Sequence, residues 1–266
     1  MNPEKEIPLL SSLDRRNPVL TRSALLQGAL FLVFLAAYFF ETRTILGVNA
    51  WLKPLKFASS IFIYQITLVF YQKAFPPNAD NKRISRLSLV IAATMIGEII
   101  FVSVQALRGV RSHFNHDSIL NGVFYSLMGI LILINTVAVS LFFRNLKKHD
   151  AISPSMLFAL RAGAVLFLLG SVFGGVMSGL DRHTVGGPDG GPGIPLLNWS
   201  AQHGDIRAAH FFGLHALQIL PIFALFIRKK EKTGLMILFT ALYGILVMAI
   251  FLRAMTGGNL LLFAGG

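Results

Sequence analysis

The chain has 266 residues, of which 54% are hydrophobic and 14% are charged, and it contains no cysteine. A soluble domain carries about 25% charged residues, and the apolar residues here fall in long blocks, so disorder, a repeat solenoid and a disulfide scaffold are excluded and an integral membrane protein remains. The net charge of +12 is then explained by cytoplasmic loops that face anionic lipid rather than by nucleic-acid binding.

Seven apolar stretches are long enough to cross a bilayer, because a transmembrane helix needs about 20 mostly apolar residues. We therefore predict an all-α integral membrane protein that forms a seven-transmembrane helix bundle. The expected organisation is a cytoplasmic tail (1–22), a membrane domain (23–254) that includes an outer loop (181–206), and an outer C-terminal tail (255–266). The spans are expected at 23–40, 54–73, 86–107, 118–143, 155–180, 208–227 and 234–254.

The distribution of Lys and Arg predicts the orientation. The N-terminal tail and the loops after spans two, four and six together hold 15 of these residues, whereas the opposite side holds 8. The positive-inside rule therefore places the N-terminus in the cytoplasm and the C-terminus outside.

Two charged residues belong to the second and third spans. Glu98 is the only acidic residue deep in a span, and Lys56 lies near the start of span two. The two can form a structural charge pair, or Glu98 can accept a proton within a polar cavity. The sequence leaves both interpretations open.

The loop between spans three and four contains two histidines. His113 and His116 have the His-x-x-His spacing that can chelate a metal, although two solvated loop histidines explain the same pattern. Asp117 or Ser118 is expected to cap span four.

The outer loop between spans five and six contains a run of glycines and prolines. Residues 186–193 are incompatible with helix or strand, and they match neither a dinucleotide-binding motif nor a P-loop. The apolar residues that follow favour docking onto the bundle, so we expect this loop to fold back and close a single site with the loop between spans three and four. These apolar residues are Ile194, Leu196, Leu197 and Trp199.

Span six begins with a polar segment. His203, Arg207 and His210 share one helical face if the helix begins that early. His215 and Gln218 lie one or two turns deeper, where polar side chains face the bundle interior, and they serve either a function or an interhelical hydrogen bond.

Three functions fit this inventory. A membrane oxidoreductase with haem or a transition metal would use His113, His116, His210 and His215 as ligands, with Arg108, Arg111, Arg207 and Lys56 available for haem propionates or a quinone headgroup. A metal-free acid–base enzyme on a lipid-linked substrate would use His203, Asp205, His215 and Glu98. An ion- or proton-linked transporter or sensor would use Glu98, Lys56 and His215.

The stretch from Gly190 through His203-Gly204-Asp205-Ile206-Arg207 to His215 resembles one found in a group of bacterial multi-span inner-membrane proteins. The resemblance implies a bacterial origin and a multi-pass protein of the inner (plasma) membrane, whose outer side would then be periplasmic. It implies no activity.

Overall fold

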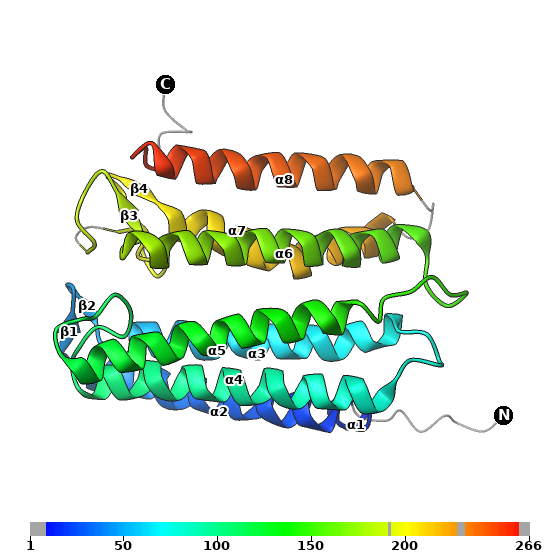
Figure 1. The fold of residues 1–266 in the computed structure, drawn as a ribbon, viewed down its shortest axis with the longest axis horizontal. Coiled ribbons are helices and arrows are strands. Elements are labelled where there is room, and N and C mark those ends of the chain that lie inside the picture. Colours follow the sequence, from blue (N-terminus) through cyan, green and yellow to red (C-terminus); the bar gives the residue numbers. More distant parts are fainter. Residues whose placement is uncertain (1–8, 191–192, 228–231, 261–266) are drawn as a thin grey trace. The chain divides into compact units, whose positions relative to one another are not determined.

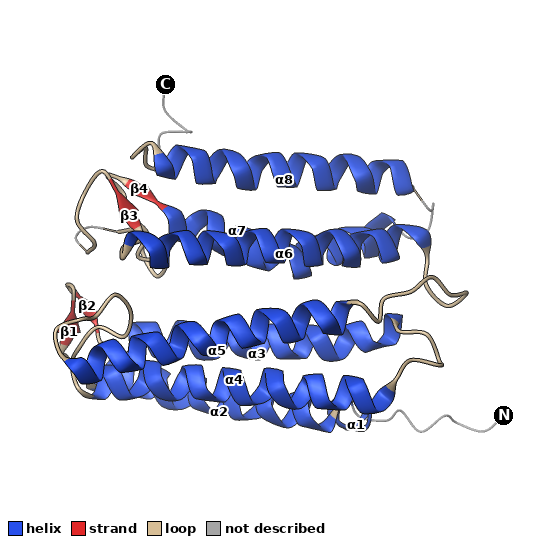
Figure 2. Ribbon diagram, viewed as in Figure 1, coloured by secondary structure: helices blue, strands red, loops and turns tan. Residues whose placement is uncertain are grey.

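The computed structural model describes residues 9–190, 193–227 and 232–260, and most of these residues are helical (Figure 2). Parts of both expected tails, residues 1–8 and 261–266, lie outside the described residues, as do the loop cations Arg228, Lys229 and Lys230.

Seven helices among the described residues are long and apolar enough to cross a membrane, which confirms the predicted all-α class and the number of candidate spans. A short helix, α1 (Leu9–Arg16), precedes them, and a 3₁₀ turn, η1 (Gln72–Ala74), follows the second. The seven are α2 (Pro18–Phe40), α3 (Leu52–Tyr71), α4 (Asn81–Leu107), α5 (Ile119–Phe143), α6 (Pro154–Leu180), α7 (Ile206–Ile227) and α8 (Thr233–Met255), labelled in Figure 1.

The chain forms two compact units. Unit 1 covers residues 1–43, 50–110 and 126–145, and unit 2 covers residues 44–49, 111–125 and 146–266. Unit 1 therefore holds α2, α3, α4 and most of α5, whereas unit 2 holds α6, α7, α8 and the connections that precede α6 and α7.

Polar caps fix where the helices of unit 1 begin. Asn17 accepts a hydrogen bond from the amide of Leu20 at 3.0 Å, and Pro18 occupies the first position of α2, where a missing N–H costs nothing. Asp80 accepts in the same way from the amide of Arg83 and starts α4. Both helices begin five residues before the apolar stretch that predicted them, because the cap and a polar first turn precede the apolar block.

Close backbone contact joins α6 to α7 in unit 2. A Cβ on Gly170 would lie 2.8 Å from the amide nitrogen of Leu214, and one on Gly213 would lie 2.6 Å from the Cα of Gly170. Only glycine permits this approach, which is the usual role of small residues between membrane helices. Phe173 of α6 stacks on Phe251 of α8 with ring centroids 4.1 Å apart, so α8 completes the core of the unit.

Two pairs of very short strands lie in the connections. β1 (Thr44–Ile45) and β2 (Val48–Asn49) form a hairpin whose turn residues, Leu46 and Gly47, both have positive φ. β3 (Thr184–Val185) pairs with β4 (Gly204–Asp205) in antiparallel register, with Thr184 opposite Asp205. The second pair closes the base of the outer loop and positions the site described next.

Candidate functional site

Hydrogen bonds and an ion pair among its own residues stabilise the loop between α4 and α5. Asn115 is buried and donates from Nδ2 to the carbonyl of Arg111 at 2.7 Å, and Arg111 forms an ion pair with Asp117 at 3.4 Å. The Ser118 hydroxyl accepts from the amide of Asn121 at 3.3 Å. Ser118 is therefore the N-cap of α5, one of the two caps that the sequence predicted.

This loop contacts the end of α6 and the start of the outer loop, all within unit 2. His116 Nε2 lies 3.0 Å from a carboxylate oxygen of Asp181, which is exposed. The ring of Phe114 lies 6.3 Å from that of His183 and packs against the core of α6, α7 and α8. The two loops therefore meet, and the residues of the outer loop that join them are Asp181 and His183.

The outer loop is docked onto unit 2 over its described residues. Trp199 is buried, with its ring 5.5 Å from that of Phe211 on α7, and Ile194 and Leu197 pack against the same core. This confirms the expected docking. Leu196 was expected to dock as well, but that expectation was wrong, because its side chain is 77% exposed.

Asp205 anchors the end of the outer loop to α7. Its carboxylate accepts from Arg207 at 2.9 Å on one oxygen and 2.6 Å on the other, and from the amide of Ser200 at 2.8 Å. Arg207 also donates to the carbonyl of Asn198. Burial by itself raises the pKa of Asp205, but the hydrogen bonds and charge of Arg207, together with His183 and the Ser200 amide, outweigh it and hold the pKa below its usual value of 3.8.

The same carboxylate sets the start of α7. Asp205 accepts from the amide of Arg207 at 3.1 Å, and the amide of Ile206 donates to the carbonyl of His183 at 3.0 Å. The helix therefore begins at Ile206, and the expected helical face of His203, Arg207 and His210 is wrong for His203. His203 precedes β4, and its ring packs against Gly187, where an added Cβ would lie 2.3 Å from it.

His183 lies between two carboxylates. Its Nδ1 is 3.3 Å from Asp189 and 3.9 Å from Asp205, and its side chain is 14% exposed. Asp189 is itself oriented by the amide of Thr184, which donates to it at 2.8 Å. Nδ1 also lies 3.1 Å from the hydroxyl of Thr184. In the tautomer that carries its proton on Nδ1, facing the carboxylates, the other ring nitrogen is the one available for acid–base exchange.

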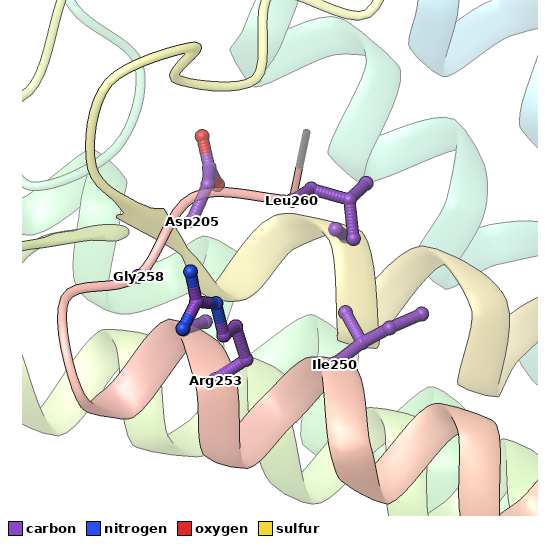
Figure 3. A pocket seen from close by; sticks show the side chains of 7 residues that line it. Asp205, Ile250, Arg253, Gly258 and Leu260 are labelled. Carbon is purple, nitrogen blue, oxygen red and sulfur yellow. The ribbon is translucent and has the colours of Figure 1, made fainter. Parts of the chain in front are cut away.

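A small hollow lies beside Asp205, between this residue and the end of α8. Asp205 and Arg253 line it together with an apolar wall that includes Ile250 and Leu260. Figure 3 shows Asp205 and Arg253 at one part of the hollow and the two apolar side chains at another. Because Asp205 also lies beside His183, one carboxylate connects the imidazole to the hollow.

The two histidines of α7 have different surroundings. His210 Nδ1 lies 2.7 Å from the carbonyl oxygen of Gly170, and the ring fits against Gly174 of α6, where a Cβ would lie 3.1 Å from it. His215 pairs with the side chain of Gln218, and its ring lies 4.2 Å from that of Phe211, so both of these contacts are made within α7. His210 therefore has an interhelical packing role, which these contacts do not give to His215.

Three further predicted site residues belong to unit 1. Glu98 is buried in α4 at 1% exposure, and neither carboxylate oxygen has a hydrogen-bond partner within the described part of the chain, so Lys56 makes no hydrogen bond to it. Lys56 lies in the first turns of α3, and Arg108 follows α4 and donates to Gln105. The site on unit 2 is built without them.

Among the described residues, no group of three or more His, Asp or Glu side chains gathers closely enough to hold a metal ion. The haem and transition-metal hypothesis therefore has no such ligand group to support it. Comparison of the chain with protein-family models, with curated proteins and with solved structures finds no match.

His183 and Asp189 are the candidate site residues that sequence reasoning did not select. Both lie in the outer loop, within residues 181–206. Their importance depends on the pairing of β3 with β4, which brings Asp205 beside His183. The sequence showed Asp205 and Arg207 two positions apart, but it did not show that His183 would lie beside Asp205.

Proposed function

We propose that this is a multi-pass protein of the bacterial inner membrane that carries a metal-free acid–base site for a phosphate-bearing, lipid-like substrate at its outer face. The observation that carries this proposal is the position of His183, which lies 3.3 Å from Asp189 and 3.9 Å from Asp205. A histidine oriented by a carboxylate is a usable general base and acid near neutral pH.

The two carboxylates serve His183 differently in this proposal. Asp189 accepts backbone amides at the start of the outer loop and fixes the orientation of the ring. Asp205 is tied to Arg207, which keeps it ionised, and its charge stabilises the imidazolium that forms when His183 takes a proton from the substrate or from water.

The hollow beside Asp205 supports the choice of substrate. It combines a cation, Arg253, with an apolar wall formed by side chains such as Ile250 and Leu260. A guanidinium is well suited to a phosphate, and the apolar wall suits an acyl or isoprenoid chain that enters from the bilayer. The hollow is too small to enclose an acyl chain, so in this proposal it meets only the phosphate and the adjoining carbons of the amphiphile.

The location at the outer face rests on the Lys and Arg count of 15 against 8. An alkaline-phosphatase fusion after the last residue should be enzymatically active in a bacterial host, because that enzyme folds only outside the cytoplasm. An inactive C-terminal fusion, with an active fusion in the loop after α5, would reverse the proposed topology.

Lipid binding tests the site itself. In native mass spectrometry of the detergent-purified protein, phosphatidylglycerol should bind, and diacylglycerol with the same chains should bind more weakly. Arg253→Gln should weaken phosphatidylglycerol binding by about tenfold, because a charge-assisted hydrogen bond contributes about 1.5–3 kcal/mol.

Arg144→Gln is the matched control, since Arg144 is exposed in the connection that follows α5. The proposed substrate class is wrong if diacylglycerol binds equally well, or if the Arg144 and Arg253 variants lose the same affinity.

A further inference from the structure

Buried polar side chains form a row through α2, α3 and α4 in unit 1. Asn17 donates from Nδ2 to the hydroxyl of Ser88 at 2.7 Å, and Gln65 donates from Nε2 to the hydroxyl of Ser23 at 2.9 Å. All four side chains are buried. Polar groups at such positions are costly in a membrane helix bundle and mark functional paths.

The first of these hydrogen bonds sets the register of two parallel helices. α2 and α4 run in the same direction (Figure 1), and the Asn17–Ser88 contact places the start of α2 level with the third turn of α4. Gln27 and Glu98 each lie ten residues further along, which is about 15 Å at 1.5 Å per residue. The amide and the carboxyl group therefore lie at the same height on buried faces of α2 and α4.

Several polar atoms along this row have no hydrogen-bond partner among the residues that the structure describes. They are both carboxylate oxygens of Glu98, both polar atoms of Gln27, Oε1 of Gln65 and the hydroxyl of Thr21. The Gln27 side chain is 0% exposed and that of Glu98 is 1% exposed. An unpaired buried amide costs about 1–3 kcal/mol and an unpaired buried carboxylate far more, so these groups require a ligand that can pair with all of them.

We propose that Glu98 binds a proton and that water held by Gln27, Gln65 and Thr21 connects it to the end of unit 1 at which α2 and α4 begin. Protonation removes the charge that burial penalises, and water supplies both donors and acceptors. Thr21, Ser23 and Gln27 are spaced two and four residues apart on α2, about 3 and 6 Å along its axis, which one or two hydrogen-bonded waters span.

The charges around Glu98 make its proton exchangeable. None of the buried side chains of α2, which include Thr21 and Gln27, is titratable. On α3, Lys53 is the cation whose charge acts on Glu98, Lys56 lies one turn further along, and Tyr64 shares a hydrogen bond with Asn135. A cation on one side lowers the cost of the ionised carboxylate, so the proton can leave along the row. This inference concerns unit 1 and does not depend on the proposed lipid site.

Infrared spectroscopy of the protein in nanodiscs tests the proton. At neutral pH, where exposed carboxyl groups are ionised, the wild type should show the C=O band of a protonated carboxylic acid, and Glu98→Gln should lack it. Transfer to D2O should shift this band rapidly in the wild type and at least about tenfold more slowly in Gln27→Leu, because the leucine removes the groups that hold the water.

Thr136→Val is the control, since the Thr136 hydroxyl bonds within its own helix to the carbonyl of Ile132, and exchange should remain fast in this variant. The absence of an acid band that depends on Glu98, or an exchange rate that Gln27→Leu leaves unchanged, overturns the proposal.

A second measurement uses the unmodified protein in case a variant does not fold. A hydrophobic carbodiimide reacts with protonated carboxyl groups within a membrane, so peptide mass spectrometry should locate the label at Glu98 near neutral pH and show less of it at alkaline pH. Labelling that spares Glu98 at every pH contradicts the proposal.

Discussion

The contact between Gly170 and Gly213 offers a strong test of how unit 2 is packed. In Gly170→Ala the new Cβ would lie 2.8 Å from the amide nitrogen of Leu214, whereas ordinary contact begins at 3.4 Å. Because the new Cβ would meet backbone atoms of α7, which cannot rotate away, α6 and α7 must move apart by about the difference between these two distances. The hydrogen bond between His210 and the carbonyl of Gly170, 2.7 Å long, lies at the same point and is weakened with them.

The expected magnitude combines three terms. Overpacking costs about 1–3 kcal/mol, the strained hydrogen bond about 0.5–1.5 kcal/mol, and alanine regains up to about 1 kcal/mol of helix propensity. The net loss of about 0.5–3.5 kcal/mol should lower the midpoint of thermal unfolding in detergent by several degrees.

Gly175→Ala on the same helix is the matched control, because a Cβ there meets nothing within 4 Å, and its midpoint should stay the same or rise. Equal midpoints for Gly170→Ala and the wild type, or an equal loss in both variants, would refute the close backbone packing of α6 on α7.

Three further predictions concern stability. Asp205→Asn should lower the unfolding free energy by about 2–4 kcal/mol, because it leaves Arg207 without its bidentate partner, and a thermal midpoint equal to that of the wild type would contradict this. The pKa of Asp205 is lower in the folded protein than in the unfolded chain. Its contribution to the free energy of unfolding is therefore complete above about pH 4 and is lost as the pH falls through the folded pKa. The difference in thermal midpoint between the wild type and Asp205→Asn should narrow over that pH range, and a difference that widens in acid would show the opposite shift. Ser153→Ala should cost about 0.5–2 kcal/mol, because Ser153 accepts from the amide of Met156 at the start of α6, whereas Ser85→Ala at an exposed position of α4 should leave the midpoint unchanged.

The spans were predictable because each is a continuous apolar block, and burial in lipid leaves few alternatives to a helix. The close packing of α6 was also visible, since Gly163, Gly170 and Gly174 mark one small-residue face and all three have close neighbours on α7. Helix starts were less accurate, because Asn17 and Asp80 cap helices whose first turns are polar.

The candidate site was predictable only in part. The sequence identified the outer loop, Asp205 and Arg207, and the docking of Trp199. It did not identify His183, because the strands that position this residue are two residues long and are separated by a segment rich in glycine and proline. Periodicity needs a longer run to appear, so a strand of this length leaves no pattern.

The same limit applies to the histidines of α7. Their depth in the span predicted a polar role, but whether His210 binds a ligand or a carbonyl depends on what α6 presents to it. Glycine at positions 170 and 174 brings the α6 backbone within hydrogen-bond reach, and that register is a property of two packed helices rather than of either segment alone.

Lipid turnover tests the central claim most directly. The wild-type protein, His183→Gln and the control His149→Gln, whose histidine lies in the connection between α5 and α6, would each be incubated in nanodiscs made from bacterial inner-membrane lipids, and the lipids would then be compared by mass spectrometry. If His183 is the proton-transferring group, the wild type and His149→Gln should convert the same phosphate-bearing lipid, and His183→Gln should convert it at least about a hundredfold more slowly, as expected for loss of a general base. Conversion that is equally fast in His183→Gln, or no lipid that changes in the wild type, would contradict an acid–base site at His183.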